Sequence, residues 1–76
     1  MARRRTAKTL HERIGDRVRA LREEAGLSQM DMVRDHKWSL SHLGKVERGV
    51  TDARISTLAR LAEDLGVTLS QLLDEV

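Results

Sequence analysis

Apolar residues recur every three or four positions along this 76-residue chain, which is the period of an amphipathic helix. In the first such run Leu10, Ile14, Val18 and Leu21 share one helical face, and Gly26 follows as a stop. No stretch is a credible strand, and the chain contains no proline. The pattern therefore predicts an all-α fold. Its five helices are expected over about 10–25, from Ser28 to Asp35 or His36, and over about 39–48, 55–65 and 69–75.

The core of this fold has to be almost entirely aliphatic, because Trp38 is the only Phe, Tyr or Trp residue in the chain. The length allows a single domain, which buries about 60% of its unfolded surface. We predict a compact five-helix domain over residues 10–76, preceded by a flexible basic arm over residues 1–9. Cysteine is absent, which excludes disulfides, thiolate zinc sites and cysteine nucleophiles.

Polar residues mark where several of these helices begin. Ser28 with Asp31, and Thr68 with Gln71, have the spacing of capping boxes at the second and fifth helices. Ser39 is the expected N-cap of the third helix. In the fourth helix we expect a buried stripe formed by Ile55, Leu58, Leu61, Ala62 and Leu65.

The composition argues against several classes of function. The apolar runs are too short to span a membrane, and no apolar stretch follows the basic N-terminus as in a secretory signal. We therefore expect a cytoplasmic protein. His11, His36 and His42 lack the spacing and companion ligands of a metal site, and no nucleophile, base and orienting group can be assembled. We expect no enzyme activity, cofactor, metal or small-molecule ligand.

The net charge of +2 conceals a gradient along the chain. Residues 1–22 include eight basic and two acidic residues, whereas residues 61–76 include four acidic and no basic residues. A polyanion such as DNA is attracted to the N-terminal part and not to the acidic end. In the arm, Arg3, Arg4 and Arg5 suit phosphate or minor-groove contacts and equally suit a solvated tail with only non-specific attraction.

The helix over about 39–48 has two chemically different faces. Its inner face contains Leu43, Val46 and Glu47. Its outer face combines a hydroxyl, a glycine and two cations, from Ser41, Gly44, Lys45 and Arg48. Small residues allow close approach to base edges, and a lysine can donate to guanine O6 and N7. For an isolated helix an ordinary solvated face is the default interpretation, but the preceding short helix, the tight connection and the basic flank favour insertion into the major groove.

Several segments of the sequence resemble a known family. They are Ile14-Gly15-x-Arg17-Val18-Arg19-x-Leu21-Arg22, Gly26-Leu27-Ser28-Gln29 and Val46-Glu47-Arg48-Gly49, followed by apolar positions from Ile55 to Leu73. Over residues 14–73 the chain resembles the Cro and phage-repressor type of helix-turn-helix domain, called the XRE family. It departs from the family at Lys37, where glycine is usual in the turn, at Ala53, which replaces a common proline, and at Arg54, which replaces a common capping serine.

The resemblance implies roles for the residues of the helix-turn-helix unit. Gln29 matches the residue that grips a DNA phosphate at the start of the second helix. The base-facing positions of the family match Leu40, Ser41, Gly44 and Lys45. Arg48 matches a phosphate contact, and Ser39 and His42 are within reach of the phosphate backbone. For Ser39 a plain N-cap is an equal alternative.

Two conspicuous groups are expected to be structural. Trp38 matches an apolar position before the recognition helix, so we expect it to pack in the core rather than stack on a base. Glu47 lies on the inner face, and its counterpart in the family usually pairs with the arginine that matches Arg22. We expect a partly buried ion pair between Arg22 and Glu47 that fixes the third helix against the first.

The C-terminal region has more apolar surface than one short helix needs in order to dock on its own core. The residues are Val67, Leu69, Leu72, Leu73 and Val76. In related short repressors this region forms a two-fold dimer interface. We therefore predict a homodimer through Leu69, Leu72, Leu73 and Val76, with its two recognition helices about 34 Å apart. The alternative is that the last helix only closes the core of the monomer.

These observations predict a sequence-specific transcriptional regulator that binds an inverted-repeat operator in double-stranded DNA as a homodimer. The size and layout resemble phage-type repressors and also the controller proteins of restriction–modification systems, and the sequence does not separate the two. Two other classes remain open. One is an antitoxin-type protein-interaction module with secondary DNA binding, and the other is a non-specific nucleoid-binding protein.

Overall fold

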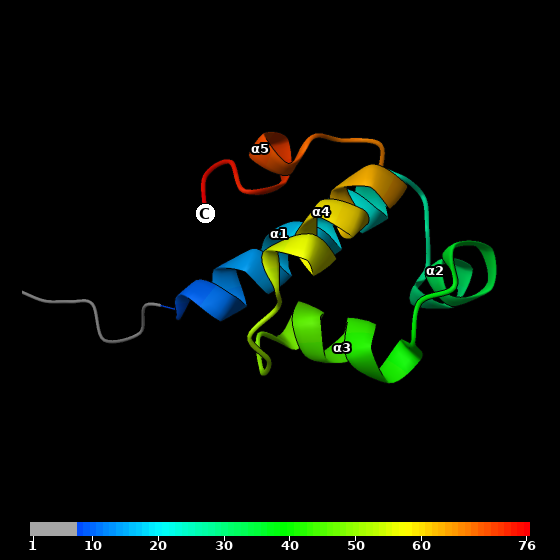
Figure 1. Cartoon of the computed structure of the whole chain (residues 1–76), viewed down its shortest axis with the longest axis horizontal. Coiled ribbons are helices and arrows are strands. Elements are labelled where there is room, and N and C mark those ends of the chain that lie inside the picture. The colour runs from blue at the N-terminus through cyan, green and yellow to red at the C-terminus, as the bar shows by residue number, and fades with distance from the viewer. Residues whose placement is uncertain (1–7) are drawn as a thin grey trace, which may run out of the picture.

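The computed structural model describes residues 8–76. Its helices are α1 (Leu10–Glu24), α2 (Gln29–His36), α3 (Leu40–Arg48), α4 (Ile55–Asp64) and α5 (Leu69–Leu72). In Figure 1, α3 and α5 lie on opposite sides of α1, α4 lies in front of α1, and α2 lies at one end of α3. The described residues form no strand, and the predicted all-α fold is confirmed. Between residues 8 and 76, no helix combines the length and the apolar content needed to cross a membrane.

Capping boxes begin three of the helices, and those at α2 and α5 are the predicted ones. The third, at α1, was not predicted. There Thr9 Oγ1 accepts from the Glu12 N–H at 3.1 Å, and the Glu12 carboxylate accepts from the Thr9 N–H at 2.9 Å. Thr9 thus belongs to the helical domain rather than to the predicted arm of residues 1–9. Residues 1–7 of that arm lie outside the described part of the chain.

The core is aliphatic apart from one tryptophan, as the composition requires. Its buried side chains are those of Val18, Leu21, Met32, Trp38, Leu43, Val46, Leu58, Leu61, Ala62, Leu65 and Leu72. The prediction that Ile55 is buried was wrong, because this side chain is 65% exposed. Helical spacing placed Ile55 correctly on the inner stripe of α4, but it is the first residue of the helix and projects beyond the packed region. The last helix, α5, is also shorter than the predicted 69–75.

Two glycines allow α1 and the C-terminal half of α3 to approach backbone to backbone. A Cβ atom on Gly15 would lie 2.5 Å from the carbonyl oxygens of both Val46 and Glu47. A Cβ on Gly49, where α3 ends with φ 71°, would lie 2.5 Å from the Cα of Glu12. Only glycine fits at either position. The orientation of α3 on α1 is therefore fixed by main-chain contacts.

Candidate nucleic-acid interface

The turn between α2 and α3 contains a non-glycine residue in the left-handed conformation. Lys37 has φ 61° and ψ 35°, a region that costs an L-residue roughly 1–2 kcal/mol. The N–H groups of Lys37 and Trp38 both donate to the carbonyl oxygen of Met32, which closes α2. Position 37 therefore has the backbone conformation that explains the family's usual glycine, although the side chain here is lysine.

Side chains of α4 hold this turn in place. Arg60 Nη2 donates to the carbonyl oxygen of His36 at 2.7 Å, and its guanidinium carbon lies 4.1 Å from the centroid of the Trp38 ring. Trp38 Nε1 donates to Asp64 at 2.7 Å. Trp38 is buried, so its predicted packing in the core is confirmed. The turn is thus attached to α4 through one aromatic ring and two charged groups.

The two faces of α3 differ as the sequence predicts. Leu43, Val46 and Glu47 are buried, whereas Ser41, Lys45 and Arg48 are exposed. Leu40, at the start of the helix, is a large apolar side chain that is 46% exposed. Ser39 is the N-cap, and its Oγ accepts from the His42 N–H at 3.2 Å. Ser39 therefore has the predicted capping role.

Gly44 is the exception on the outer face. It is buried, because the side chain of Arg48, one turn later, lies over it. A Cβ atom on Gly44 would lie 3.0 Å from Arg48 Nη1 and would meet no other residue closely. The expected bare glycine is thus covered by the end of a flexible side chain. Gly44 is open to contact from outside only when the Arg48 guanidinium moves away.

The ion pair between Arg22 and Glu47 is present and almost completely buried. Arg22 Nε donates to Glu47 Oε2 at 2.7 Å, and Nη2 donates to Oε1 at 3.0 Å. The third guanidinium nitrogen, Nη1, donates to the carbonyl oxygen of Leu27 at 2.7 Å. The hydrogen bonds that Arg22 donates to the Glu47 carboxylate raise the pKa of the guanidinium above its ordinary value. This bidentate pair ties α3 to α1 and to the loop before α2.

A polar hollow of about 380 Å³ lies beside this pair, where α1, α2 and α3 meet. Its lining residues are Arg19, Arg22, Gln29, Glu47 and Arg48. The amide of Gln29 donates to Glu47 at 3.1 Å, so this side chain extends the buried network. Sequence reasoning missed Arg19, although its position three residues before Arg22 was the available signal. The function of Gln29 as a phosphate contact stays a prediction.

A second polar hollow, of about 460 Å³, lies on the opposite flank of α3, next to α4. It is lined by Lys37, Trp38, Ser39, His42, Ser56, Thr57 and Arg60. His42 contacts Trp38 edge-on, with ring centroids 6.3 Å apart. Both hollows beside α3 therefore contain cationic side chains, and the one next to α4 also contains hydroxyl groups.

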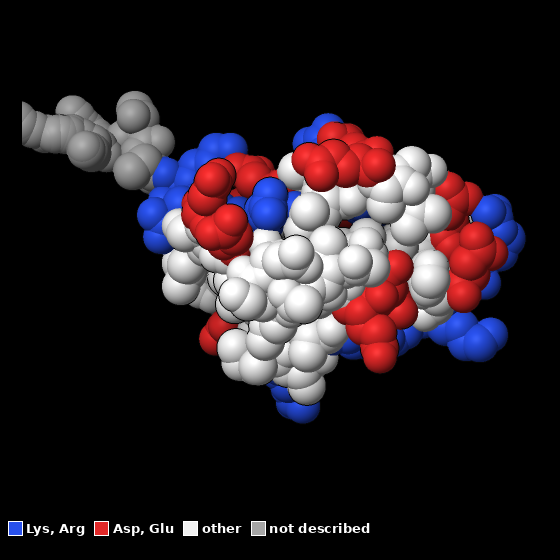
Figure 2. Space-filling model, turned by 90° about the horizontal axis from the view of Figure 1, so that it is seen from above, with Lys and Arg blue, Asp and Glu red and all other residues white. Residues whose placement is uncertain are grey.

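The predicted dimer residues of the last helix differ in their exposure. Leu72 is completely buried in the core of its own monomer, so it is not a free interface residue. Leu69, Leu73 and Val76 are half-buried. Figure 2 shows the side of the molecule that bears α5, where an uncharged central area is bordered by several acidic groups and by some basic ones.

The remaining predictions concern the basic arm and metal binding. Arg3, Arg4 and Arg5 lie outside the described residues. Between residues 8 and 76, no three His, Asp or Glu side chains come together in the way that metal ligands do.

Comparison with known proteins agrees with this geometry. Residues 13–75 match the family described as a helix-turn-helix domain. The chain is 38% identical over 61 residues to the HTH-type transcriptional regulator DdrOP3 of Deinococcus deserti. It is 32% identical over 62 residues to the immunity repressor protein of Bacillus phage phi105. These matches include 80% and 82% of this chain but 47% and 43% of the relatives, so the chain spans less than half the length of either protein.

Two solved structures share the fold. The clp gene regulator ClgR of C. glutamicum superposes with a TM-score of 0.82 at 23% identity, over 92% of this chain and 90% of that one. A transcriptional regulator of the HTH_3 family from Vibrio cholerae superposes with a TM-score of 0.74 at 29% identity, over 82% of this chain and 35% of that one.

Proposed function

This chain belongs to the helix-turn-helix family of DNA-binding transcriptional regulators, and we propose that it binds an inverted-repeat operator sequence-specifically as a homodimer in the cytoplasm. The observation that supports the proposal best is the exposed face of α3 between two polar hollows that contain cations. A B-DNA major groove is about 12 Å wide and admits one helix with a phosphate strand on either side. In this proposal the two phosphate strands run past the two hollows beside α3.

In this proposal the first half of α3 and Lys45 contact base edges. Lys45 is exposed, and its ammonium group suits the O6 and N7 acceptors of guanine. Leu40 is the one large apolar side chain on the face and suits the methyl group of thymine. The Ser41 hydroxyl both donates and accepts, so it supports either kind of base pair. Gly44 joins this surface once Arg48 has moved away.

Phosphate contacts set the position of α3 in the groove. We assign Gln29 and Arg48 to a phosphate of one strand, beside the hollow that they line with Arg19. Ser39 and His42 are assigned to a phosphate of the other strand, at the hollow next to α4. The basic arm, with Arg3, Arg4 and Arg5, adds attraction to the same polyanion.

Dimerisation places two copies of α3 on successive turns of one DNA face, about 34 Å apart. An inverted repeat in the operator then mirrors the two-fold axis of the protein. One curated relative is a transcriptional regulator and the other is an immunity repressor, which supports control of transcription as the result of binding.

Selection of binding sites from a random duplex pool by the full chain tests the proposal. The expected product is an inverted repeat with half-site centres about 10 bp apart, and it should survive excess random competitor at moderate salt. A pool without enrichment would identify a non-specific nucleoid-binding protein. Enrichment that appears only after a protein partner is added would favour the antitoxin-type module.

Lys45→Ala tests the assignment of the base-contacting face. Binding to the selected site should weaken by about 1–3 kcal/mol, with relaxed preference at one base pair. Arg34→Ala is the matched control, because it removes one exposed cation from α2 without touching α3. Binding constants for the selected site and its single-base variants provide the measurement. An equal loss on every sequence would make Lys45 a phosphate contact instead.

A further inference from the structure

The polar hollow beside the buried ion pair has an excess of positive charge. Its lining contains three arginines and one glutamate, three positive charges against one negative, so its formal charge is +2. The helix α1 contributes Arg19 and Arg22, α2 contributes Gln29, and α3 contributes Glu47 and Arg48. Three helices therefore meet around a concave surface that attracts an anion.

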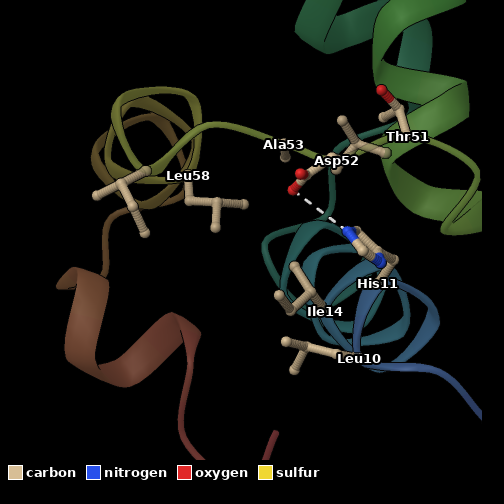
Figure 3. Close-up of a pocket in the computed structure, with 9 residues that line it drawn as sticks. Leu10, His11, Ile14, Thr51, Asp52, Ala53 and Leu58 are labelled. Atoms are coloured by element: carbon tan, nitrogen blue, oxygen red, sulfur yellow. Dashed lines mark ion pairs between the residues drawn. The ribbon is translucent and has the colours of Figure 1, made fainter.

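The apolar hollow between α1 and α4 has the opposite character (Figure 3). It has a volume of about 170 Å³, and aliphatic side chains such as Leu10, Ile14 and Leu58 form most of its lining. His11 and Asp52 pair with each other there at 3.2 Å, as the dashed line in Figure 3 marks. Among the described residues, those that line this hollow include no lysine or arginine. An anion is therefore attracted to the polar hollow and not to this one.

In the polar hollow, Arg22 is already occupied by contacts within the protein. Its Nε and Nη2 donate to Glu47, its Nη1 donates to a backbone carbonyl oxygen, and its side chain is only 10% exposed. The same bonds neutralise the Glu47 carboxylate, which also accepts from the Gln29 amide. The positive charge that a ligand can reach is therefore that of Arg19 and Arg48.

Arg19 has a single weak contact. Its Nε lies 3.2 Å from Oε2 of Glu23, one turn later on α1, and the two side chains are 63% and 56% exposed. Within residues 8–76, the two terminal nitrogens of Arg19 form no hydrogen bond. An exposed pair one turn apart on a helix is among the weakest ion pairs in proteins. Arg19 can therefore leave Glu23 at little cost to the fold.

The free end of Arg19 has the geometry that phosphate recognition requires. A guanidinium presents its N–H groups in a planar fork that matches two oxygens of one phosphate. Gln29 and Arg48, which line the same hollow, are the residues already assigned to a phosphate of one DNA strand. Arg19 supplies a ligand from α1, so each of the three helices contributes one.

We propose that Arg19 is a third ligand of this phosphate and that it exchanges Glu23 for the phosphate when DNA binds. The inference rests on the proposed function, and it adds one ligand and one competing carboxylate to one of the two phosphate sites. Glu23 lowers the affinity for DNA, because the phosphate has to displace it from Arg19 and because its charge repels the phosphate.

Arg19→Ala in the full chain tests the ligand. Binding to the selected operator and to an unrelated duplex is measured between about 50 and 200 mM salt. On both duplexes the slope of log K against log salt should become shallower by about 0.9, and binding at the low-salt end should weaken about 10-fold. Arg13→Ala is the matched control, because Arg13 is an exposed arginine of α1 that does not line the hollow, and its slope should stay near that of the wild type. An unchanged urea midpoint verifies that each variant is folded.

Glu23→Gln tests the exchange. It should tighten binding to both duplexes about 2-fold to 3-fold, because Arg19 is then free before DNA arrives. Glu24→Gln makes the same change of charge at the next exposed residue and should have a smaller effect. In the Arg19→Ala background, Glu23→Gln should have no effect, since the two residues act through one contact.

Three results would overturn the inference. The first is a wild-type salt slope in Arg19→Ala. The second is an equal gain from Glu23→Gln with and without Arg19, which would make its effect one of general charge. The third is a loss in Arg19→Ala that is confined to particular base pairs, because phosphate contacts carry no sequence information.

The unrelated duplex separates this inference from the proposed function. A chain without operator preference, whose salt slope Arg19→Ala still reduces on every duplex, would refute only sequence-specific regulation. A chain that selects an inverted repeat but keeps its salt slope in Arg19→Ala would refute only the role of Arg19.

Discussion

The two ends of α3 are held in different ways. At its C-terminal half, Gly15 allows direct contact between the backbones of α1 and α3, and the buried pair of Arg22 and Glu47 lies alongside. At its N-terminal end, a left-handed Lys37 is held by Arg60, whose side chain is 48% exposed. Contact between two backbones holds the C-terminal half of α3 rigidly. The N-terminal end is held by an exposed side chain, which can change its conformation. The more adjustable end is also the one that we propose enters the DNA groove.

The largest effect should come from breaking the rigid attachment at Glu47. Glu47→Ala leaves Arg22 buried without its carboxylate and removes the partner of Gln29. We expect the free energy of unfolding in urea to fall by about 3–5 kcal/mol. Glu23→Ala is the control, since it removes an exposed pair with Arg19 and should cost at most about 0.5 kcal/mol. Equal losses in the two variants would contradict the structural role of Glu47.

Gly15→Ala should have the next largest effect, because its Cβ would collide with two backbone carbonyl oxygens of α3. We expect a loss of about 1–3 kcal/mol in the free energy of unfolding, as for overpacked cores. Gly44→Ala is the same substitution in a helix where only the end of Arg48 is near. It should stabilise the protein by about 0.5–1 kcal/mol, since alanine favours helices over glycine. The contrast fails if both variants shift the urea midpoint in one direction.

Lys37→Gly should stabilise the turn between α2 and α3. Glycine adopts φ 61° without strain, so we expect a gain of about 1 kcal/mol after its larger unfolded-state entropy is counted. Lys37→Ala removes the same charge but keeps the strained backbone, and it should show no such gain. Thermal unfolding of the three proteins gives the comparison. A similar gain in Lys37→Ala would attribute the effect to charge.

The smallest effect is expected at the start of α4, which has no side-chain cap because its N-cap residue is Arg54. Arg54→Ser should supply a hydroxyl acceptor and raise the free energy of unfolding by about 0.5–1 kcal/mol. Arg54→Ala, measured in the same denaturation series, should be neutral. A serine variant no more stable than the alanine variant would show that water already satisfies these N–H groups.

Local signals in the sequence predict most of the fold. A capping box marks the start of α2, and the Ser39 N-cap and Gly49 mark the two ends of α3. These signals act within one helical turn and are therefore readable from the sequence. Contacts between distant residues are harder to predict. The close approach at Gly15 and the brace of Arg60 on Trp38 depend on how helices pack, and periodicity says nothing about either. Ile55 shows the same limit, because spacing identifies a helical face but not how far a neighbour covers it.

The sequence predicts those parts of the candidate site that depend on one helix and misses parts that depend on how helices pack. The inner and outer faces of α3 follow from its geometry alone, and the ion pair of Glu47 follows from the family pattern. The cover of Arg48 over Gly44 involves neighbours on a single helix and was within reach of the sequence. The hollow next to α4 combines residues of α3, α4 and the turn before α3, so it could be found only from the tertiary arrangement.

The outer face of α3 contributes little to the stability of the fold. Within residues 8–76, the side chains of Ser41 and Lys45 form no hydrogen bond or ion pair, and position 44 has room for a methyl group once Arg48 shifts. Substitutions at these three positions therefore leave Gly15, Gly49 and the Arg22–Glu47 pair intact. Under the proposed assignment of these positions to base contacts, base preference can change here at little cost in stability, so one scaffold could serve regulators of different operators.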